Sequence, residues 1–405
     1  MNASKERFVG LEWLRFLLGL YIVIFHTLHA YPSIRSWSHY ITDVGFFSTS
    51  AFFVLSGFLL AHVYLDDQRR MREPPRSFWI KRFSNLYPIH IGALVLAMSL
   101  ATLIGYLQIT PEDADASIRF VLYDVNKDMG ENGHLLRHVM GDTELAINLL
   151  LNVTLLHAWN PFYLTFNPPS WSISVLFFFY LLFPWLAPRL FRVQHRVRAL
   201  ALTMACYLVP TLVVIVTTDY GMPETGILHR NPLIRLPEFI AGILLCSLYA
   251  HYRRQGHSLD RRMGWGLAGF VALSVIAAVQ LLQLGRTWYY LLHNGLLLPA
   301  QLALIFLAAH WRAPRRDSLK RLASRLGGAS LPMFALHVPL YVIFTRIEMV
   351  LTGETSLARY PLFLLLTVLF CIFFQEAFVQ RIKLLLQRLL LSRKPVAHVD
   401  KIAPH

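Results

Sequence analysis

The chain has 405 residues, of which 56% are hydrophobic, 13% aromatic and only 15% charged. This composition excludes an ordinary soluble domain and a disordered chain, and it indicates a protein that crosses a membrane many times. The formal net charge of +15 would suit a nucleic-acid partner, but the basic residues follow the loops between apolar runs, so no such partner is expected.

Ten apolar runs are long enough to cross a bilayer, since about 17 to 25 residues span its hydrocarbon core. In chain order they are residues 9–30, 44–65, 86–108, 170–188, 199–217, 233–250, 264–283, 289–310, 330–350 and 360–382. The stretch 145–157 is shorter and is predicted to be a partly embedded or cavity-lining helix. The first run carries Arg15 and lacks a small-residue cleavage site, so we expect it to stay in place as a membrane anchor.

With ten crossings, both termini lie on one side of the membrane. Basic residues gather in the termini and in the loops of that side, and the opposite loops hold few of them. The few are Arg35, Arg119, Lys127, Arg137, Arg230, Arg286 and Arg359. The positive-inside rule therefore places both termini in the cytoplasm.

The first run carries titratable residues that a bilayer disfavours. Arg15 and His26 are eleven residues apart, close to three helical turns, so they share one helix face with His29 nearby. A charge at the bilayer centre costs roughly 2.5 to 3.5 kcal/mol on insertion scales, so such residues mark a cavity or a functional pair by default. Two alternatives remain. Each histidine could simply form a hydrogen bond to a neighbouring helix, and the Arg15 side chain could extend to the membrane surface.

A basic segment precedes the third run. Residues 69–88 read RRMREPPRSFWIKRFSNLYP, and guanidinium groups of this kind can bind phosphate. Arg82 and its neighbour Lys81 also lie where basic residues commonly anchor a helix at the cytoplasmic face of the membrane. Phosphate binding and membrane anchoring therefore both remain open.

Later runs contribute further polar candidates. Trp171 is either a platform on which a substrate stacks or a residue of the interfacial aromatic belt. Arg235 and Glu238, one turn apart, are placed to form a local ion pair. His337, near the middle of the ninth run, is either a site residue or a packing residue.

Six segments, in their order and spacing, resemble the membrane core of the acyltransferase 3 family. They are LEWLRFLLGLYIVIFHTLHA, GFFSTSAFFVLSGFLLAHVY, FWIKRFSNLYPIHI, NPPSWSISVLFFFYLLFP, RLPEFIAGILL and SLPMFALHVPLY. The resemblance covers residues 8–385. Together with the apolar runs it predicts one all-α polytopic domain over residues 1–390, about ten transmembrane helices around a central polar cavity, and a polar tail at 391–405.

This resemblance implies an integral O-acyltransferase of the bacterial inner membrane. Such an enzyme moves an acyl group, usually acetyl, from cytoplasmic acyl-CoA to a hydroxyl of a glycan or lipid-linked glycan. Acyl-CoA is then a substrate, and no permanently bound cofactor or metal is expected. Membrane lipid and periplasmic or glycan-export proteins are the other partners that it implies.

The resemblance also implies roles for individual residues. His26 would be the catalytic base, with Arg15 part of its motif, and an imidazole suits the removal of a proton from a sugar hydroxyl near neutral pH. Arg82 and Trp79 match an arginine motif and, with Arg76, would bind acyl-CoA. Acceptor-binding or supporting roles fall to Trp171, Ser172, Tyr180, Arg235, Glu238 and His337. No serine or cysteine is placed as a covalent nucleophile, so direct transfer is expected.

Two positions depart from the family pattern. Leu176 stands where the family commonly has glutamate, and Asn85 stands where it usually has a second arginine. Our hypothesis is that the two losses compensate each other, if the missing carboxylate and guanidinium would otherwise pair. Two further readings stay open: a small-molecule acceptor such as a macrolide or amino sugar, and a transporter or inactive homologue in which His26 relays protons.

Overall fold

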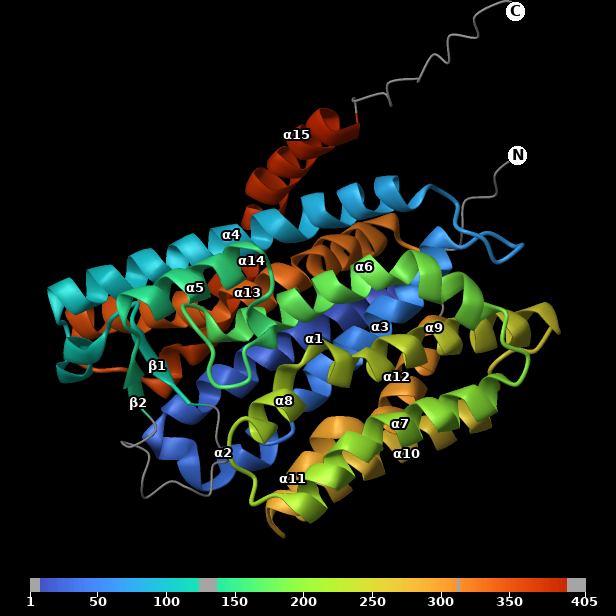
Figure 1. Ribbon diagram of the computed structural model, residues 1–405, viewed down its shortest axis with the longest axis horizontal. Coiled ribbons are helices and arrows are strands. Elements are labelled where there is room, and N and C mark those ends of the chain that lie inside the picture. The colour runs from blue at the N-terminus through green and yellow to red at the C-terminus, as the bar shows by residue number, and fades with distance from the viewer. Residues whose placement is uncertain (1–7, 124–136, 312–313, 392–405) are drawn as a thin grey trace, which may run out of the picture.

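The computed structural model describes residues 8–123, 137–311 and 314–391, which form a bundle of helices with one small hairpin (Figure 1). Most of the predicted tail at 391–405 lies outside the described residues. The long helices are α1 (Val9–Thr27), α3 (Phe46–Tyr64), α4 (Pro75–Leu107), α6 (Trp171–Phe191), α7 (Arg196–Thr217), α9 (Pro232–Arg254), α10 (Arg261–Leu282), α12 (Leu298–His310), α13 (Asp317–Thr352) and α14 (Tyr360–Phe373).

Shorter elements join the long helices. The short helices are α2 (Arg35–Thr42), α5 (Asp142–Val153), α8 (Glu224–Arg230), α11 (Arg286–Leu291) and α15 (Gln380–Leu391). Two π-helical segments are η7 (Leu292–Leu296) and η9 (Phe374–Val379), and the 3-10 turns include η3 (Pro111–Asp115), η5 (His157–Trp159) and η6 (Pro168–Ser170). Strands β1 (Phe120–Leu122) and β2 (Arg137–Val139) pair antiparallel, with Phe120 opposite Val139.

Among the described residues, nine helical segments are long and apolar enough to cross a membrane. A tenth is a bent pair, Arg286–Leu296 with Leu298–His310, in which the second half is bent by 42° from the direction of the first. The structure therefore confirms a largely helical, multi-pass protein, while the count of ten remains a prediction. The predicted run 289–310 is a broken helix and not a straight one, because Gly295 adopts φ of 121°, which glycine reaches without steric cost.

Helix boundaries differ from the apolar runs at several ends. α4 begins at Pro75 and α13 at Asp317, each more than two turns before the predicted span, because a helix continues through polar turns outside the hydrocarbon. Proline in the first turn of α4 costs no hydrogen bond there. The short stretch predicted at 145–157 is helical as far as Val153 and then turns into η5.

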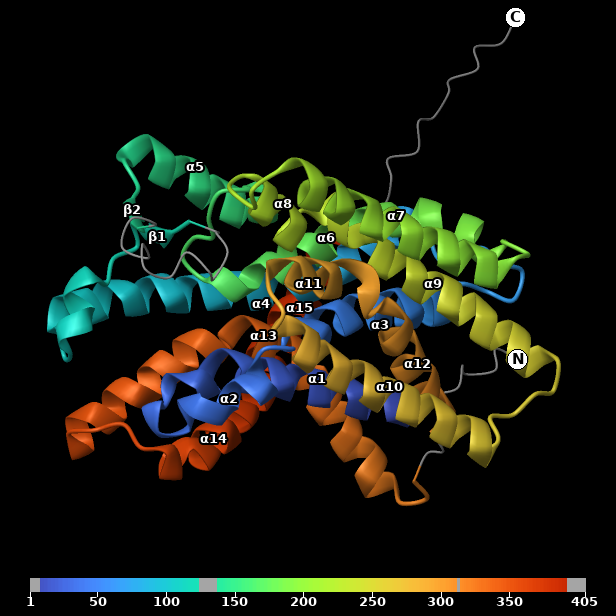
Figure 2. The same ribbon diagram turned by 90° about the horizontal axis from the view of Figure 1, so that it is seen from below.

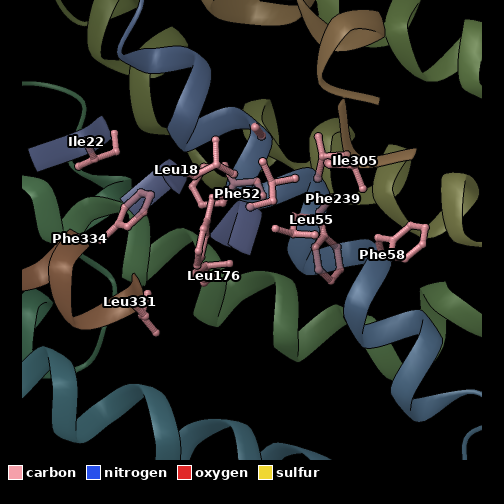
Figure 3. Packing of buried hydrophobic residues seen from close by; sticks show 14 of the residues in the cluster. Leu18, Ile22, Phe52, Leu55, Phe58, Leu176, Phe239, Ile305, Leu331 and Phe334 are labelled. Carbon is pink, nitrogen blue, oxygen red and sulfur yellow. The ribbon is translucent and has the colours of Figure 1, made fainter. Parts of the chain in front are cut away.

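The core of the bundle surrounds α1 and α3. α1 packs along α13, and α3 packs against α9 with nearly all of its side chains buried. A Cβ at Gly57 would lie 2.2 Å from the Phe239 carbonyl oxygen, and one at Gly242 would lie 1.9 Å from that of Val54. The close approach of α3 and α9 thus depends on glycines, the device typical of membrane helix pairs. Figure 3 shows the apolar side chains that fill this region.

The two ends of the bundle differ. The α3–α4 and α9–α10 connections lie at one end, and the β1–β2 hairpin lies at the other (Figure 1). We name these the inner end and the outer end, after the predicted topology. α7 and α10 lie at the edge of the bundle, and most of their apolar side chains are exposed, as expected of helices that face lipid.

Ion pairs fix the polar cap at the outer end. Arg346 of α13 donates from Nε to both oxygens of Asp113, at 3.0 Å each. Burial raises the pKa of Asp113, but the Arg346 guanidinium and the Thr110 amide outweigh that effect and hold it below its usual value. Hydrogen bonds from Tyr163 and His138 likewise lower the pKa of Glu144. These contacts hold η3 and the hairpin in place beside α4.

Candidate active site

His26 and His337 meet near the C-terminal end of α1. His26 comes from α1 and His337 from α13, the pair of helices that pack along each other. His337 Nε2 lies 3.0 Å from His26 Nδ1, and the ring centroids are 4.8 Å apart. His337 is fully buried, whereas His26 is half-buried. The histidines that were singled out separately in the sequence therefore form one pair.

The surrounding carbonyl groups determine which nitrogen of each ring carries the proton. The Met333 carbonyl, 2.8 Å from His337 Nδ1, can only accept, so this nitrogen is the donor. With both rings neutral, His337 Nε2 is then an acceptor, and His26 Nδ1 donates to it and to the Ile22 carbonyl at 3.1 Å. His26 Nε2 is consequently left with a lone pair, which is the state of a general base.

A proline and an asparagine hold the segment around His337. Pro339 has no N–H to donate to the carbonyl of Ala335, one turn earlier in α13. Asn167 Nδ2 donates to this carbonyl instead, at 2.8 Å. Asn167 immediately precedes η6, so the same bond fastens the loop before α6 to the helix that carries His337.

A cavity of about 250 Å³ adjoins His26. We call it the histidine cavity, and its wall is made by Phe25, His26, Asp43, Phe46, Thr49, Leu164, Pro168, Pro169, Trp171, His229, Tyr289, His293 and Val338. Trp171 thus shares a cavity with His26. His29 does not line this wall and is exposed in the turn after α1. Asp43, His229 and His293 were not predicted, because they come from segments distant from His26 in the sequence.

A second, polar cavity opens at the inner end. This inner cavity measures about 520 Å³ and is lined by Glu12, Arg15, Tyr64, Lys81, Arg82, Asn85, Ser324, Gly328, Gln375, Gln380, Lys383 and Gln387. Its lining holds four cations, from α1, α4 and α15, and one carboxylate. Lys81 is also paired with Glu73, and the positive charge that remains favours an anionic guest. Arg82 bonds the Tyr64 hydroxyl, and its Nε is buried with no partner among the described residues.

The remaining predicted donor-site residues lie elsewhere. Arg76 is exposed in the first turns of α4. Trp79 packs against Trp185, with ring centroids 5.2 Å apart, and donates from Nε1 to the Tyr180 carbonyl at 3.1 Å. Lys383, which was not predicted, lines the inner cavity, whereas Arg76 and Trp79 do not. Its neighbours Gln380 and Gln387 share its helix face, a polar stripe that could have been recognised in the sequence.

Phe52 of α3 lines the deepest part of the inner cavity, one turn from a residue of the histidine cavity. A deeper branch of the inner cavity, about 220 Å³, is lined by Tyr180 and Phe52 as well as by Arg15 and Arg82. Phe52 packs against Phe334 with the rings tilted by 39° and their centroids 4.7 Å apart, and both belong to the packed cluster in Figure 3. Thr49, one turn before Phe52 on α3, already lines the histidine cavity. Thr49 and Phe52 thus bring neighbouring turns of α3 to the two cavities.

Arg235 and Glu238 form a fully buried ion pair at 3.1 Å, and neither lines the histidine cavity. Arg235 donates to the His293 carbonyl at 3.0 Å, and its guanidinium carbon lies 5.9 Å from the centre of the Trp171 ring. The pair therefore supports two residues of the cavity wall. Ser172 is also buried, and its hydroxyl donates to the Pro169 carbonyl at 3.0 Å.

Leu176 lies in the apolar core, with 1% of its surface exposed, in the cluster that contains Leu18 and Phe52 (Figure 3). We expect Leu176→Glu to cost about 3 to 5 kcal/mol of unfolding free energy, because it buries an unpaired carboxylate. Tyr180, one turn later, shares a cavity with Asn85. The double variant with Asn85→Arg should therefore recover stability if the two departures compensate.

Thermal unfolding of the detergent-solubilised protein measures this effect. Leu176→Gln is the control, since it has nearly the shape of glutamate without the charge. Unchanged stability and activity in Leu176→Glu would contradict the compensation hypothesis.

Comparison with known proteins identifies the family to which the chain belongs. The model of the acyltransferase 3 family, described as an acyltransferase domain, matches residues 8–376. Acyltransferase MdmB of Streptomyces mycarofaciens is 27% identical over 224 residues, which are 52% of this chain and 48% of MdmB. Protein 2 in picA locus of Rhizobium radiobacter is 30% identical over 178 residues, which are 42% of this chain and 78% of that protein.

The aligned part thus spans about half the length of MdmB. No solved structure matches the chain. The family match, by contrast, begins at the first described residue and runs through every helix that contributes to the histidine cavity. The chain belongs to the acyltransferase 3 family of membrane acyltransferases.

Proposed function

We propose that this protein transfers an acyl group, such as acetyl, from cytoplasmic acyl-CoA to a hydroxyl of a glycan at the outer face of the bacterial inner membrane. The observation that carries the proposal is the His26–His337 pair, which leaves His26 Nε2 as a base on the wall of a cavity. Both termini then lie in the cytoplasm, on the side of the inner cavity.

The inner cavity holds the phosphates of the donor. Arg15, Arg82 and Lys383 supply charge-assisted hydrogen bonds to them. Arg15 and His26 lie on one helix, and eleven residues rise about 16 Å. Coenzyme A carries its thioester at the end of a long flexible arm, so the phosphates stay at the inner end while the thioester passes Phe52 and reaches His26.

Transfer then takes place in one displacement. His26 Nε2 removes the proton of the acceptor hydroxyl as its oxygen attacks the thioester carbon. The carbon–oxygen bond forms, the carbon–sulfur bond breaks, and the departing thiolate takes the proton from His26. Thr49 and His293 stand on the same wall and donate hydrogen bonds to the oxyanion. Trp171 offers an aromatic face on which the acceptor sugar stacks.

The test uses the purified protein in nanodiscs with radiolabelled acetyl-CoA and a panel of glycosides. We expect one free CoA thiol for each ester formed, and sequential kinetics. Thiol release with no labelled glycoside, or ping-pong kinetics with a trapped acyl-enzyme, would contradict direct O-acyl transfer.

His337 acts as a positioning residue for His26. We expect His337→Ala to lower kcat by about 10- to 100-fold with KM for acyl-CoA unchanged, because His26 loses the acceptor that orients its ring and stabilises its protonated form. His337→Gln keeps an acceptor on the side chain and should restore part of kcat.

His310→Ala is the matched control for His337, because His310 also contacts the carbonyl one turn earlier in its own helix, at 2.9 Å. Steady-state kinetics of the three variants check the prediction. Equal losses of kcat in His310→Ala and His337→Ala, or no recovery of kcat in His337→Gln, would show that His337 only packs in the core and does not position His26.

A further inference from the structure

We propose that a cavity at the outer end binds an apolar group attached to the acceptor, so that the substrate is an amphiphilic glycoside and not a free polar polysaccharide. This inference rests on the proposed acyl transfer and adds the chemical class of the acceptor. It concerns a site distinct from the histidine cavity, which receives the reacting hydroxyl.

The outer cavity measures about 370 Å³ and lies between α4 and the hairpin. α4 contributes Met98 and Ala101, and the hairpin contributes Phe120, Val121 and Leu122. In Figure 2 the hairpin and α5 lie on one side of α4, and α13 and α14 lie on the other. The walls are apolar apart from a few groups, so an apolar guest gains free energy by leaving water there.

The outer cavity borders the histidine cavity. Leu164, Pro168 and His229 line both of them. A molecule seated across this shared wall presents one part to His26 and Trp171 and keeps the other part between α4 and the hairpin. The histidine cavity holds side chains that can bond or stack on a sugar, such as His26, Thr49 and Trp171, whereas most side chains that line the outer cavity are apolar.

The surroundings of the outer cavity match such a guest. Leu122 lines the cavity and is still 57% exposed, and Leu103 and Tyr106 of α4 are also exposed. A polar polymer in the same place would lose water from its hydroxyls without gaining hydrogen bonds, which is costly.

The experiment compares methyl and octyl glycosides of glucose, galactose, glucosamine and N-acetylglucosamine, with labelled acetyl-CoA as donor. Each buried methylene is worth about fourfold in affinity, so we expect kcat/KM for the octyl glycoside of the accepted sugar to exceed that of the methyl glycoside at least about tenfold. Octyl glycosides are kept below their micelle concentration, so that monomers are compared.

Two variants tie this preference to the outer cavity. Ala101→Trp fills it and should remove the octyl advantage, so that kcat/KM for the octyl glycoside falls to within about twofold of that for the methyl glycoside. Val121→Asp, at a site 3% exposed, should do the same by making the wall polar. Val139→Asp is the matched control, because this valine lies on the same hairpin but is 65% exposed.

The outcomes separate the inference from the function. Equal rates with methyl and octyl glycosides, or an octyl advantage that survives Ala101→Trp and Val121→Asp alike, overturn the inference and leave acyl transfer standing. No transfer to any glycoside by the unmodified protein, with acetyl-CoA bound, overturns the proposed function and this inference with it.

Discussion

Replacing His26 with alanine is expected to lower kcat for acyl transfer by about 10²- to 10⁴-fold, the range that general base catalysis supplies. The hydroxyl of an acceptor sugar is a weak nucleophile until its proton is removed, and His26 Nε2 is the lone pair that the hydrogen-bond pattern leaves for this purpose. Binding of acyl-CoA should not change, because the phosphate site that we propose is the inner cavity, which His26 does not line.

The measurement combines initial rates of labelled ester formation with calorimetric binding of a non-hydrolysable acyl-CoA analogue. His29→Ala is the control, since His29 is an exposed histidine of the same segment, and it should keep full activity. Retention of more than a tenth of kcat in His26→Ala would rule out His26 as the base. Glycan export that is active and insensitive to this change would favour a transporter.

Replacing Arg82 with glutamine is expected to raise KM for acyl-CoA by about 10- to 100-fold, since a hydrogen bond to a charged group contributes roughly 1.5 to 3 kcal/mol. Arg82 lines both parts of the inner cavity, and its Nε is buried with no partner among the described residues. A donor site satisfies that group with a phosphate oxygen. The affinity of the protein for the acceptor should be unaffected.

The control for Arg82 comes from the same helix. Arg76→Gln removes an equal charge at an exposed position of α4 and should leave KM for acyl-CoA within about twofold. Titration of 3′-phospho-ADP, the nucleotide part of coenzyme A, checks the same contact without catalysis. Equal effects of the two substitutions would point to a general attraction for anions and would contradict a built phosphate site.

Part of the candidate site was predictable because it lies on one helix. Arg15 and His26 share a face of α1 by spacing alone, and the structure places Arg15 on the inner cavity and His26 on the histidine cavity. Arg82 was indicated by its basic segment. Arg76 was predicted from the same segment, but its side chain is exposed and does not line the inner cavity.

The sequence by itself determined that the chain is a largely helical membrane protein of the acyltransferase 3 family. The physical reason is local: in a bilayer each span must satisfy its own backbone hydrogen bonds, so apolar run length alone predicts a helix. Only the tertiary structure joined His337 to His26 across 311 residues, added His293 and Lys383, and bent the chain at Gly295. Those features depend on packing between helices that are distant in the sequence, and the local pattern of apolar residues carries no information about that packing.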